Sequence, residues 1–175
     1  GGVDGFLARR SRKMRRNLRN ADRRCHDAGI RFERFRVTRP LDVQRLFERA
    51  TAIESRSWKA RQGNGVDRGP MRVFVRNVLM RAAQIEGVRF VFATQDGRDV
   101  GYLHGADHGT AFRGFQMSYD ADFGHLSLGN RLQLEAIHWL ARDGFLLYDL
   151  GSELAYKKRW AEDELTTVGL LTVPL

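Results

Sequence analysis

Apolar residues recur along the chain with two periods, one typical of helices and the other typical of strands. Apolar positions three and four residues apart predict helices over residues 10–28, 40–59, 70–86, 129–142 and 153–162. Alternating or short continuous apolar runs between turns predict strands over residues 30–37, 88–94, 99–106, 110–119, 145–150 and 166–173. This order of elements indicates an α/β (α+β) fold, with helices on both faces of a mixed central sheet.

The apolar faces predict which side of each helix packs inward. In the helix over 10–28 the face is a narrow stripe of Met14, Leu18, Ala21 and Cys25. In the helix over 70–86 we expect the inward face to consist of Phe74, Val78, Ala82 and Ile85. The narrow stripe of the helix over 10–28 buries little apolar surface, so we expect this helix to pack against another element.

The composition is that of a folded domain. The chain has 175 residues, of which 42% are hydrophobic and 29% charged, and these fractions exclude a disordered chain. Its single cysteine, Cys25, excludes an internal disulfide and a cysteine-rich zinc site, and it fits a cytoplasmic location. The histidines lack the spacing of metal ligands, so we expect no metal. Because residue 1 is Gly and not Met, we expect the chain to be part of a longer protein.

Positive charge is concentrated at the start of the chain. The formal net charge is +9, and residues 1–36 hold 12 Arg or Lys against 4 Asp or Glu, a net charge of +8. The basic run from Arg12 to Arg24 therefore predicts a surface for a polyanion, either nucleic acid or anionic lipid. The alternative is a helix face that is simply solvated.

The junction over residues 119–134 combines the end of a strand, a loop of small residues and the start of a helix at Gly129. Free backbone N–H groups at the start of a helix bind anions, and the helix dipole assists them. Gly129 has no Cβ, so a phosphate can approach the backbone closely. The junction therefore predicts a phosphate site, although a glycine at such a turn also serves purely structural purposes.

At this junction the chain resembles the GNAT acetyltransferases, whose pyrophosphate-binding loop opens a helix after a three-strand meander. The loop pattern of that family, Q/R-x-x-G-x-G/A, falls on residues 124–129, where Gly129 matches the last glycine. The chain is more similar still to the CelD-like branch, which is related to the Fem-type aminoacyltransferases. The similarity to this branch lies in the basic helix over 11–18, LGNRL over 128–132, YDLG over 148–151 and YKKRW over 156–160.

The resemblance implies a GNAT-like, mostly antiparallel central sheet, preceded by a basic N-terminal helix. Residues 1–28 would form this helix or an inter-domain linker, and residues 29–175 the acyltransferase domain. Proteins of this branch commonly carry a second GNAT-like half upstream, so this chain would be the C-terminal half. Its protein partner would then be that upstream half or a second copy in a homo-oligomer.

The resemblance also implies acetyl-coenzyme A or another acyl-coenzyme A as the cofactor. The residues implied in holding its diphosphate are Leu128, Gly129, Asn130 and Arg131. Lys157, followed by two further basic residues, would bind the nucleotide phosphate of the cofactor. The alternative for Lys157 is a solvated helix face.

In GNAT proteins the third strand of the meander parts from the next strand and supplies a free N–H to the thioester carbonyl. Here that strand is the one predicted over 110–119, and Gly114 in its middle indicates a bulge or a close backbone approach. Gln116 and Ser118 lie on one face of this strand and are candidates for lining an acceptor channel.

Proton transfer in this reaction needs an acid for the leaving thiolate and a base for the attacking amine. The resemblance places the acid at Tyr156, and a phenol stays protonated at neutral pH. Asp149, at the end of an apolar strand, is the candidate base, and Glu153 is a second one. The structural alternatives are that Tyr156 packs or donates a hydrogen bond and that Asp149 caps the following turn.

The function that follows is N-acyl transfer from coenzyme A to a small-molecule amine by direct attack on the thioester. Two alternatives remain open. One is Fem-like, tRNA-dependent aminoacyl transfer, in which the basic segment follows an RNA backbone. The other is a non-catalytic GNAT-like module that binds a polyanion or a protein. The identity of the acceptor and the length of the acyl chain do not follow from the sequence.

Overall fold

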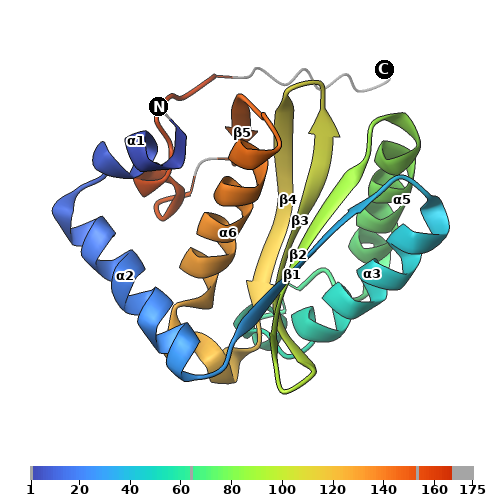
Figure 1. The fold of residues 1–175 in the computed structure, drawn as a ribbon. Helices are drawn as coiled ribbons and strands as arrows, with labels where there is room; N and C mark the ends of the chain where they lie inside the picture. The colour runs from blue at the N-terminus through green and yellow to red at the C-terminus, as the bar shows by residue number, and fades with distance from the viewer. Residues whose placement is uncertain (1, 64, 153, 167–175) are drawn as a thin grey trace, which may run out of the picture.

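The computed structural model describes residues 2–63, 65–152 and 154–166. Its centre is a five-stranded sheet in the order β1-β2-β3-β4-β5 (Figure 1). The strands are β1 (Arg31–Val37), β2 (Val88–Gln95), β3 (Arg98–His108), β4 (Ala111–Tyr119) and β5 (Leu147–Asp149). Neighbours from β1 to β4 are antiparallel, whereas β5 runs parallel to β4. The prediction of a mixed, mostly antiparallel sheet is confirmed.

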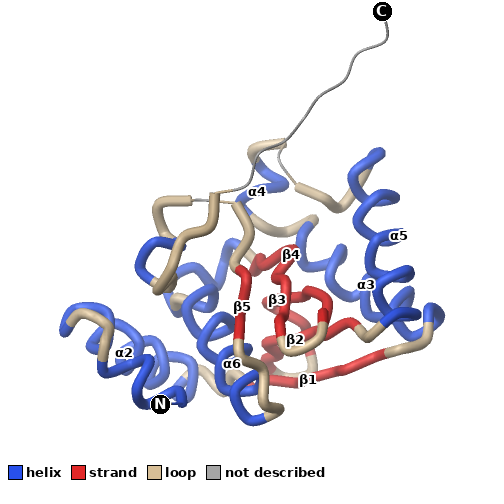
Figure 2. The backbone as a smooth tube through the Cα atoms, turned by 90° about the horizontal axis from the view of Figure 1, so that it is seen from above, coloured by secondary structure: helices blue, strands red, loops and turns tan. Residues whose placement is uncertain are grey.

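Helices cover both faces of this sheet, as Figures 1 and 2 show. One face is covered by α6 (Leu128–Arg142), with α2 (Arg12–Asp27) and α1 (Gly2–Ala8) packed on α6. The other face is covered by α3 (Pro40–Glu54) and α5 (Gly69–Ile85). The shorter segments are α4 (Trp58–Arg61) and two 3₁₀ turns, η1 (Ala121–Leu126) and η2 (Lys157–Arg159).

Two apolar clusters, one on each face of the sheet, hold these layers together. On the α6 side, Leu132 packs in one cluster with Phe112 of β4. On the other side, Leu46 of α3 and Leu79 of α5 pack in one cluster with Phe90 of β2. Each such side chain is fully or almost fully buried, which stabilises the fold by about 1.5–3 kcal/mol per residue.

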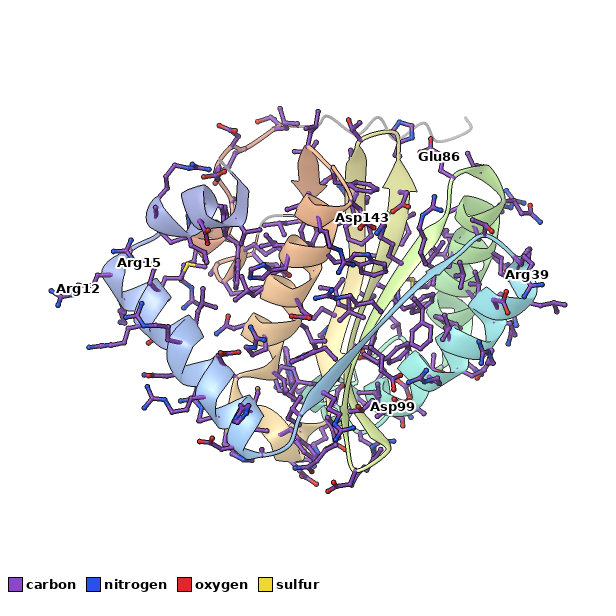
Figure 3. All side chains as sticks on the ribbon, in the orientation of Figure 1. Arg12, Arg15, Arg39, Glu86, Asp99 and Asp143 are labelled. Atoms are coloured by element: carbon purple, nitrogen blue, oxygen red, sulfur yellow. The ribbon has the colours of Figure 1, made fainter. Side chains whose placement is uncertain are left out.

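The basic helix α2 packs against α6 through its narrow apolar stripe, as expected. Met14 and Leu18 of α2 form a small cluster with Leu134 of α6 and with Trp160. Arg12 points outward from the opposite side of α2 (Figure 3). Whether this basic face binds a polyanion stays a prediction.

The expected inward face of the helix over 70–86 is wrong at Phe74 and Ile85, whereas Ala82 does pack against the core. In α5 the buried residues are Val75, Leu79 and Ala83, whereas Phe74 is 61% exposed and Ile85 is 77% exposed. Apolar residues occupy two sides of this helix, so their spacing does not decide which side packs. Contact with α3 and the sheet buries only one of the two sides.

The helix predicted over 40–59 is divided in two. The first part, α3, ends at Glu54, and α4 begins only at Trp58. Between them Ser57 is extended, and its hydroxyl accepts a hydrogen bond from the N–H of Ala60 at 3.3 Å. A serine in this position caps the start of a new helix, which explains the break.

The helix predicted over 153–162 is also wrong, because within its described part, residues 154–162, the structure has only the short turn η2. Among residues 154–166, Trp160 alone is buried, and a segment that buries so little apolar surface does not support a full helix. Apart from Thr166, the predicted strand over 166–173 lies outside the described residues, as does Glu153. The short helix α1 is an element that the hydrophobic pattern did not predict.

Candidate active site

The edge strand β5 pairs with only the first part of its neighbour β4. Their paired residues are Ala111 with Leu147, Phe112 with Tyr148 and Arg113 with Asp149. Beyond Arg113, β4 continues to Tyr119, and on this side it has no strand partner among the described residues. The last pair is closed by an ion pair between Arg113 and Asp149. The second half of β4 therefore presents an unpaired backbone edge.

A β-bulge lies at the point where the strands part. The register between β3 and β4 shifts, so that Gly105 pairs with Gly114 whereas His104 pairs with Gln116, and Phe115 is left without a partner. A Cβ on Gly114 would lie 2.9 Å from Cε2 of Tyr148. The prediction of a bulge and a close approach at Gly114 is confirmed, and the bulge lies next to the point where β4–β5 pairing ends.

The start of α6 carries unused backbone donors. Ser127 adopts the left-handed conformation (φ 59°, ψ 41°) and ends the turn η1, and α6 begins at Leu128. The N–H of Asn130 donates to the carbonyl of Ser127 at 3.0 Å. Among the described residues, the N–H groups of Leu128 and Gly129 have no backbone acceptor, and the first turn contains no acidic residue. This helix start therefore has the free donors that an anion site needs, with no acidic side chain in its first turn, and anion binding here stays a prediction.

The same helix start borders the unpaired half of β4. A Cβ on Gly129 would lie 3.4 Å from Cε1 of Tyr119 and 3.5 Å from Cε of Met117. The free donors at the start of α6 and the free edge of β4 consequently belong to one site. A ligand with an anionic end and an extended polar arm has the shape that this arrangement accommodates.

The side chains of Asn130 and Arg131 have different surroundings. Asn130 borders a small hollow between α2, α6 and η2, together with residues such as Asn17 and Arg159. The guanidinium of Arg131 forms an ion pair with Asp22 at 3.1 Å and lies over the ring of Phe32. Arg131 thus joins α6 to α2 and β1 through its side chain, and its part in cofactor binding stays a prediction.

Asp149 lies at the end of β5 with its carboxylate fully engaged. One carboxylate oxygen accepts from Arg113, and the other accepts from the N–H of Gly151 at 2.8 Å. Burial acts to raise the pKa of Asp149, but these hydrogen bonds outweigh it and the pKa lies below its ordinary value. Asp149 is therefore ionised at neutral pH, and its role as the base stays a prediction.

Tyr156 and Lys157 follow at the same end of β5. Tyr156 is 40% exposed, and burial raises the pKa of its phenol, so it stays protonated at neutral pH. The amine of Lys157 donates to the carbonyl of Ser152 at 2.9 Å and lies 6.0 Å from the ring centre of Tyr156. Burial and the charges of Arg113 and Lys59 lower the pKa of Lys157. The structure thus brings Asp149, Tyr156 and Lys157 together.

Lys59 of α4 is a residue of the site that the sequence patterns did not indicate. Its Nζ donates to the carbonyl of Met117 at 2.7 Å and to Oε1 of Gln116 at 3.4 Å, so it lies on the unpaired edge of β4. Burial lowers the pKa of Lys59, and the charge of Glu54 acts in the opposite direction. The only local signal for it is the serine cap at Ser57, which turns α4 toward β4.

Polar side chains are buried behind Lys59, on the α3 side of the sheet. Glu54 is fully buried and accepts a hydrogen bond from the hydroxyl of Tyr102 at 3.0 Å. His104 is also fully buried, and neither of its ring nitrogens has a hydrogen-bond partner among the described residues. Burial and the charge of Lys59 lower the pKa of His104 to about 3, so the ring is neutral. In the sequence, burial of Glu54 is indicated by its position on the apolar face of its helix, four residues after Ala50.

A larger hollow, of about 510 Å³, lies at the other end of α6, where Figure 3 labels Glu86 and Asp143. Its charged side chains pair with one another. Buried Arg89, for example, donates to Asp107 at 2.8 Å and to Asp143 at 2.6 Å. Because these charges already satisfy each other, the hollow is not a candidate for the reaction.

A sequence model of a protein family matches this architecture. The model is described as an acetyltransferase (GNAT) domain, and it matches residues 12–158, from the basic helix to η2. The chain belongs to the GNAT acetyltransferase family. GNAT acetyltransferases use acyl-coenzyme A, and this protein is an acyltransferase of that type, which transfers an acyl group to an amine. No curated protein sequence matches the chain.

Solved structures share the GNAT fold at low sequence identity. An aminoglycoside acetyltransferase, meta-AAC0020, from an uncultured soil metagenomic sample is 12% identical, with a TM-score of 0.55 over 85% of this chain and 99% of its own. The C-terminal domain of a putative lysylphosphatidylglycerol synthetase from Agrobacterium fabrum is 17% identical, with a TM-score of 0.54 over 83% of this chain and 43% of its own. The ribosomal-protein-S18-alanine N-acetyltransferase of Escherichia coli is 18% identical, with a TM-score of 0.50 over 75% of this chain and 74% of its own. At these identities the likeness concerns the fold.

Within the described part of the chain, no helix has both the length and the apolar character that a membrane crossing requires.

Proposed function

We propose that this GNAT protein transfers an acetyl or another acyl group from coenzyme A to a small-molecule amine, which attacks the thioester directly. One observation carries the proposal. The parting of β4 from β5 leaves a free strand edge directly beside the uncapped start of α6. Two relatives with this fold are described as acting on an aminoglycoside and on an alanine of a ribosomal protein. Their different acceptors leave the choice of amine open.

The cofactor would bind along the two free features of the site. Its diphosphate accepts hydrogen bonds from the N–H groups of Leu128 and Gly129, where the helix dipole favours a negative charge. Asn130 adds a side-chain donor next to them, and Lys157 supplies a positive charge for a phosphate of the nucleotide. The extended arm would lie along the unpaired edge of β4, where a free backbone N–H would polarise the thioester carbonyl.

Tyr156 suits the role of proton donor to the departing thiolate. Its phenol is partly exposed beside the end of β5, and its raised pKa keeps it protonated until the thiolate forms. Asp149 is the proposed base. Because both of its carboxylate oxygens already accept hydrogen bonds, from Arg113 and from the N–H of Gly151, we propose that it takes the proton of the amine through a water molecule. The pair of Asp149 with Arg113 also holds the ends of the two strands where they part.

The test is a thermal-shift panel of coenzyme A, acetyl-coenzyme A and longer acyl-coenzyme A species. A ligand that binds only the native state raises Tm, by about 2.7 kcal/mol of added stability at a hundredfold excess over Kd. We expect Tyr156→Phe to keep this shift while kcat falls by about 10²- to 10⁴-fold in an assay of free coenzyme A. Unchanged turnover in Tyr156→Phe would remove Tyr156 from the mechanism.

The remaining expectations about partners stay predictions. Retention on RNA or heparin that weakens with salt, without any shift by coenzyme A, would instead support tRNA-dependent transfer or a non-catalytic binding module. The division into a helix over 1–28 and a domain over 29–175, the upstream GNAT-like half and the cytoplasmic location are likewise predictions. Comparison of this chain with a longer natural chain, in the same thermal-shift panel, tests whether the upstream part completes the site.

A further inference from the structure

Lys59 is held in place by a set of contacts between α4 and the end of β4. Ser57 forms an isolated β-bridge with Asp120, directly after the last residue of β4. The N–H of Ala121 donates to the carbonyl of Arg56 at 3.2 Å, and Nε of Arg56 donates to Asp120 at 2.8 Å. These contacts attach the segment before Lys59 to the end of β4, so its amine is positioned rather than free to swing in solvent.

Among the described residues, both hydrogen-bond acceptors of the Lys59 amine are neutral. Its two contacts are the main-chain carbonyl of Met117 and the amide oxygen of Gln116. No ion pair within residues 2–63, 65–152 and 154–166 includes Lys59. Burial lowers its pKa, so a larger fraction of this amine is neutral and nucleophilic than of an exposed lysine.

The carbonyl of Met117 belongs to the half of β4 that β5 leaves unpaired. The arm of an acyl-coenzyme A that starts at Gly129 and follows this edge passes Met117, whose side chain lies beside the position of a Gly129 Cβ. Under the proposed function, the arm therefore passes the amine of Lys59 on its way along the unpaired half of β4 to the thioester. A positioned amine next to a bound thioester reacts far faster than one that meets the thioester by diffusion.

We propose that Lys59 is an internal acyl acceptor, which takes an acyl group from coenzyme A bound along β4. This inference rests on the proposed function. The lone pair of the neutral amine attacks the thioester carbon, a C–N bond forms, and the C–S bond breaks. The proton lost by the amine passes to the departing thiolate, and the products are Nε-acyl-lysine and free coenzyme A. No other reactant is needed.

The product is an amide, which does not pass the acyl group on to a second amine. The reaction therefore stops after one acyl group per chain and differs from turnover on an external acceptor. The modified side chain has lost its positive charge and places the acyl group beside Met117, on the unpaired half of β4. We expect the modified protein to bind acyl-coenzyme A more weakly than the unmodified protein does.

The experiment uses the purified chain and acetyl-coenzyme A whose acetyl group carries an isotope label, which distinguishes new acetylation from any acquired during expression. Intact-mass and peptide mass spectrometry follow the label over time at Lys59 and at Lys13, an exposed lysine of α2. We expect Lys59 to reach one labelled acetyl group per chain, at a rate at least about tenfold above that of Lys13. An excess of free coenzyme A should slow labelling at Lys59 and leave Lys13 unaffected.

Labelling of Lys59 that is no faster than that of Lys13, or that free coenzyme A does not slow, overturns the inference. The variant Lys59→Arg keeps a donor for the Met117 carbonyl but cannot be acylated, so it should lose the label and still show the thermal shift with coenzyme A. If acetyl-coenzyme A raises Tm while Lys59 stays unmodified, the inference is wrong and the proposed function stands. If coenzyme A produces no shift at all, the proposed function itself fails.

Discussion

Replacing Asn130 with Asp should stabilise the protein and weaken its binding of coenzyme A. Asn130 is the third residue of α6, and the first turn of this helix has no acidic residue. The N–H groups of Leu128 and Gly129 next to it have no backbone acceptor among the described residues. A carboxylate at position 130 therefore meets an uncompensated positive helix end, which the proposed function reserves for the diphosphate.

The gain in stability and the loss of affinity in Asn130→Asp arise from different interactions, so each can be calculated by itself. A carboxylate in the first turn stabilises a helix by about 0.3–1 kcal/mol. Two unit charges about 6 Å apart repel each other by roughly 3 kcal/mol at an effective dielectric constant of about 20, and salt reduces this to about 1–2 kcal/mol. The affinity for acetyl-coenzyme A should therefore fall by about 5- to 30-fold while Tm rises by about 1–3 °C.

Calorimetric titration with acetyl-coenzyme A and thermal unfolding of the free protein measure the two effects separately. Asn77→Asp is the matched control, because it makes the same change of charge at an exposed position of α5, on the other face of the sheet. We expect Asn77→Asp to bind as the natural protein does, and added salt to reduce the defect of Asn130→Asp. If Asn130→Asp binds acetyl-coenzyme A as tightly as the natural protein, the diphosphate does not lie at the start of α6.

Two further predictions concern the strands that shape the site. In Gly105→Ala the new Cβ would lie 2.1 Å from the carbonyl oxygen of Arg113, so β4 has to shift. The free energy of unfolding, measured in urea, should therefore fall by about 1–3 kcal/mol or more. In the control Gly124→Ala the nearest neighbour of the new Cβ would lie at 4.0 Å, so the free energy of unfolding should stay within about 0.5 kcal/mol of that of the natural protein. Equal losses of stability in both variants would contradict the bulge. Burial acts to raise the pKa of Asp120, but hydrogen bonding, chiefly from Arg56, outweighs it and lowers the pKa below 3.8. Ionised Asp120 thus stabilises the native state above its unfolded pKa, and this contribution is lost as pH falls through the native value. Asp120→Asn should therefore be less stable than the natural protein at neutral pH, with a difference that shrinks in acid, and a difference independent of pH would refute this assignment.

Local patterns in the sequence were sufficient to predict most of the sheet and the turn at which α6 begins. Glycine-containing turns and alternating apolar residues predicted β1 to β4, because a turn and a strand face depend on residues close together in the chain. The start of α6 was predicted at Gly129 and lies at Leu128 for the same reason. Gly114 marked the bulge, since a glycine within a strand permits the close approach that Tyr148 makes there.

Tertiary contacts decided the features that local patterns left open. Both sides of α5 carry apolar residues, and only packing on α3 determines that Leu79 is buried and Phe74 exposed. The amine of Lys59 reaches the carbonyl of Met117 across a separation of 58 residues, and no pattern within α4 indicates this. Helix and strand preferences are properties of neighbouring residues, whereas the free edge of β4 and its lysine exist only when distant segments pack together. The sequence by itself therefore determined the strands β1 to β4 and the turn that begins α6, and only the tertiary structure placed the amine of Lys59 on the unpaired half of β4.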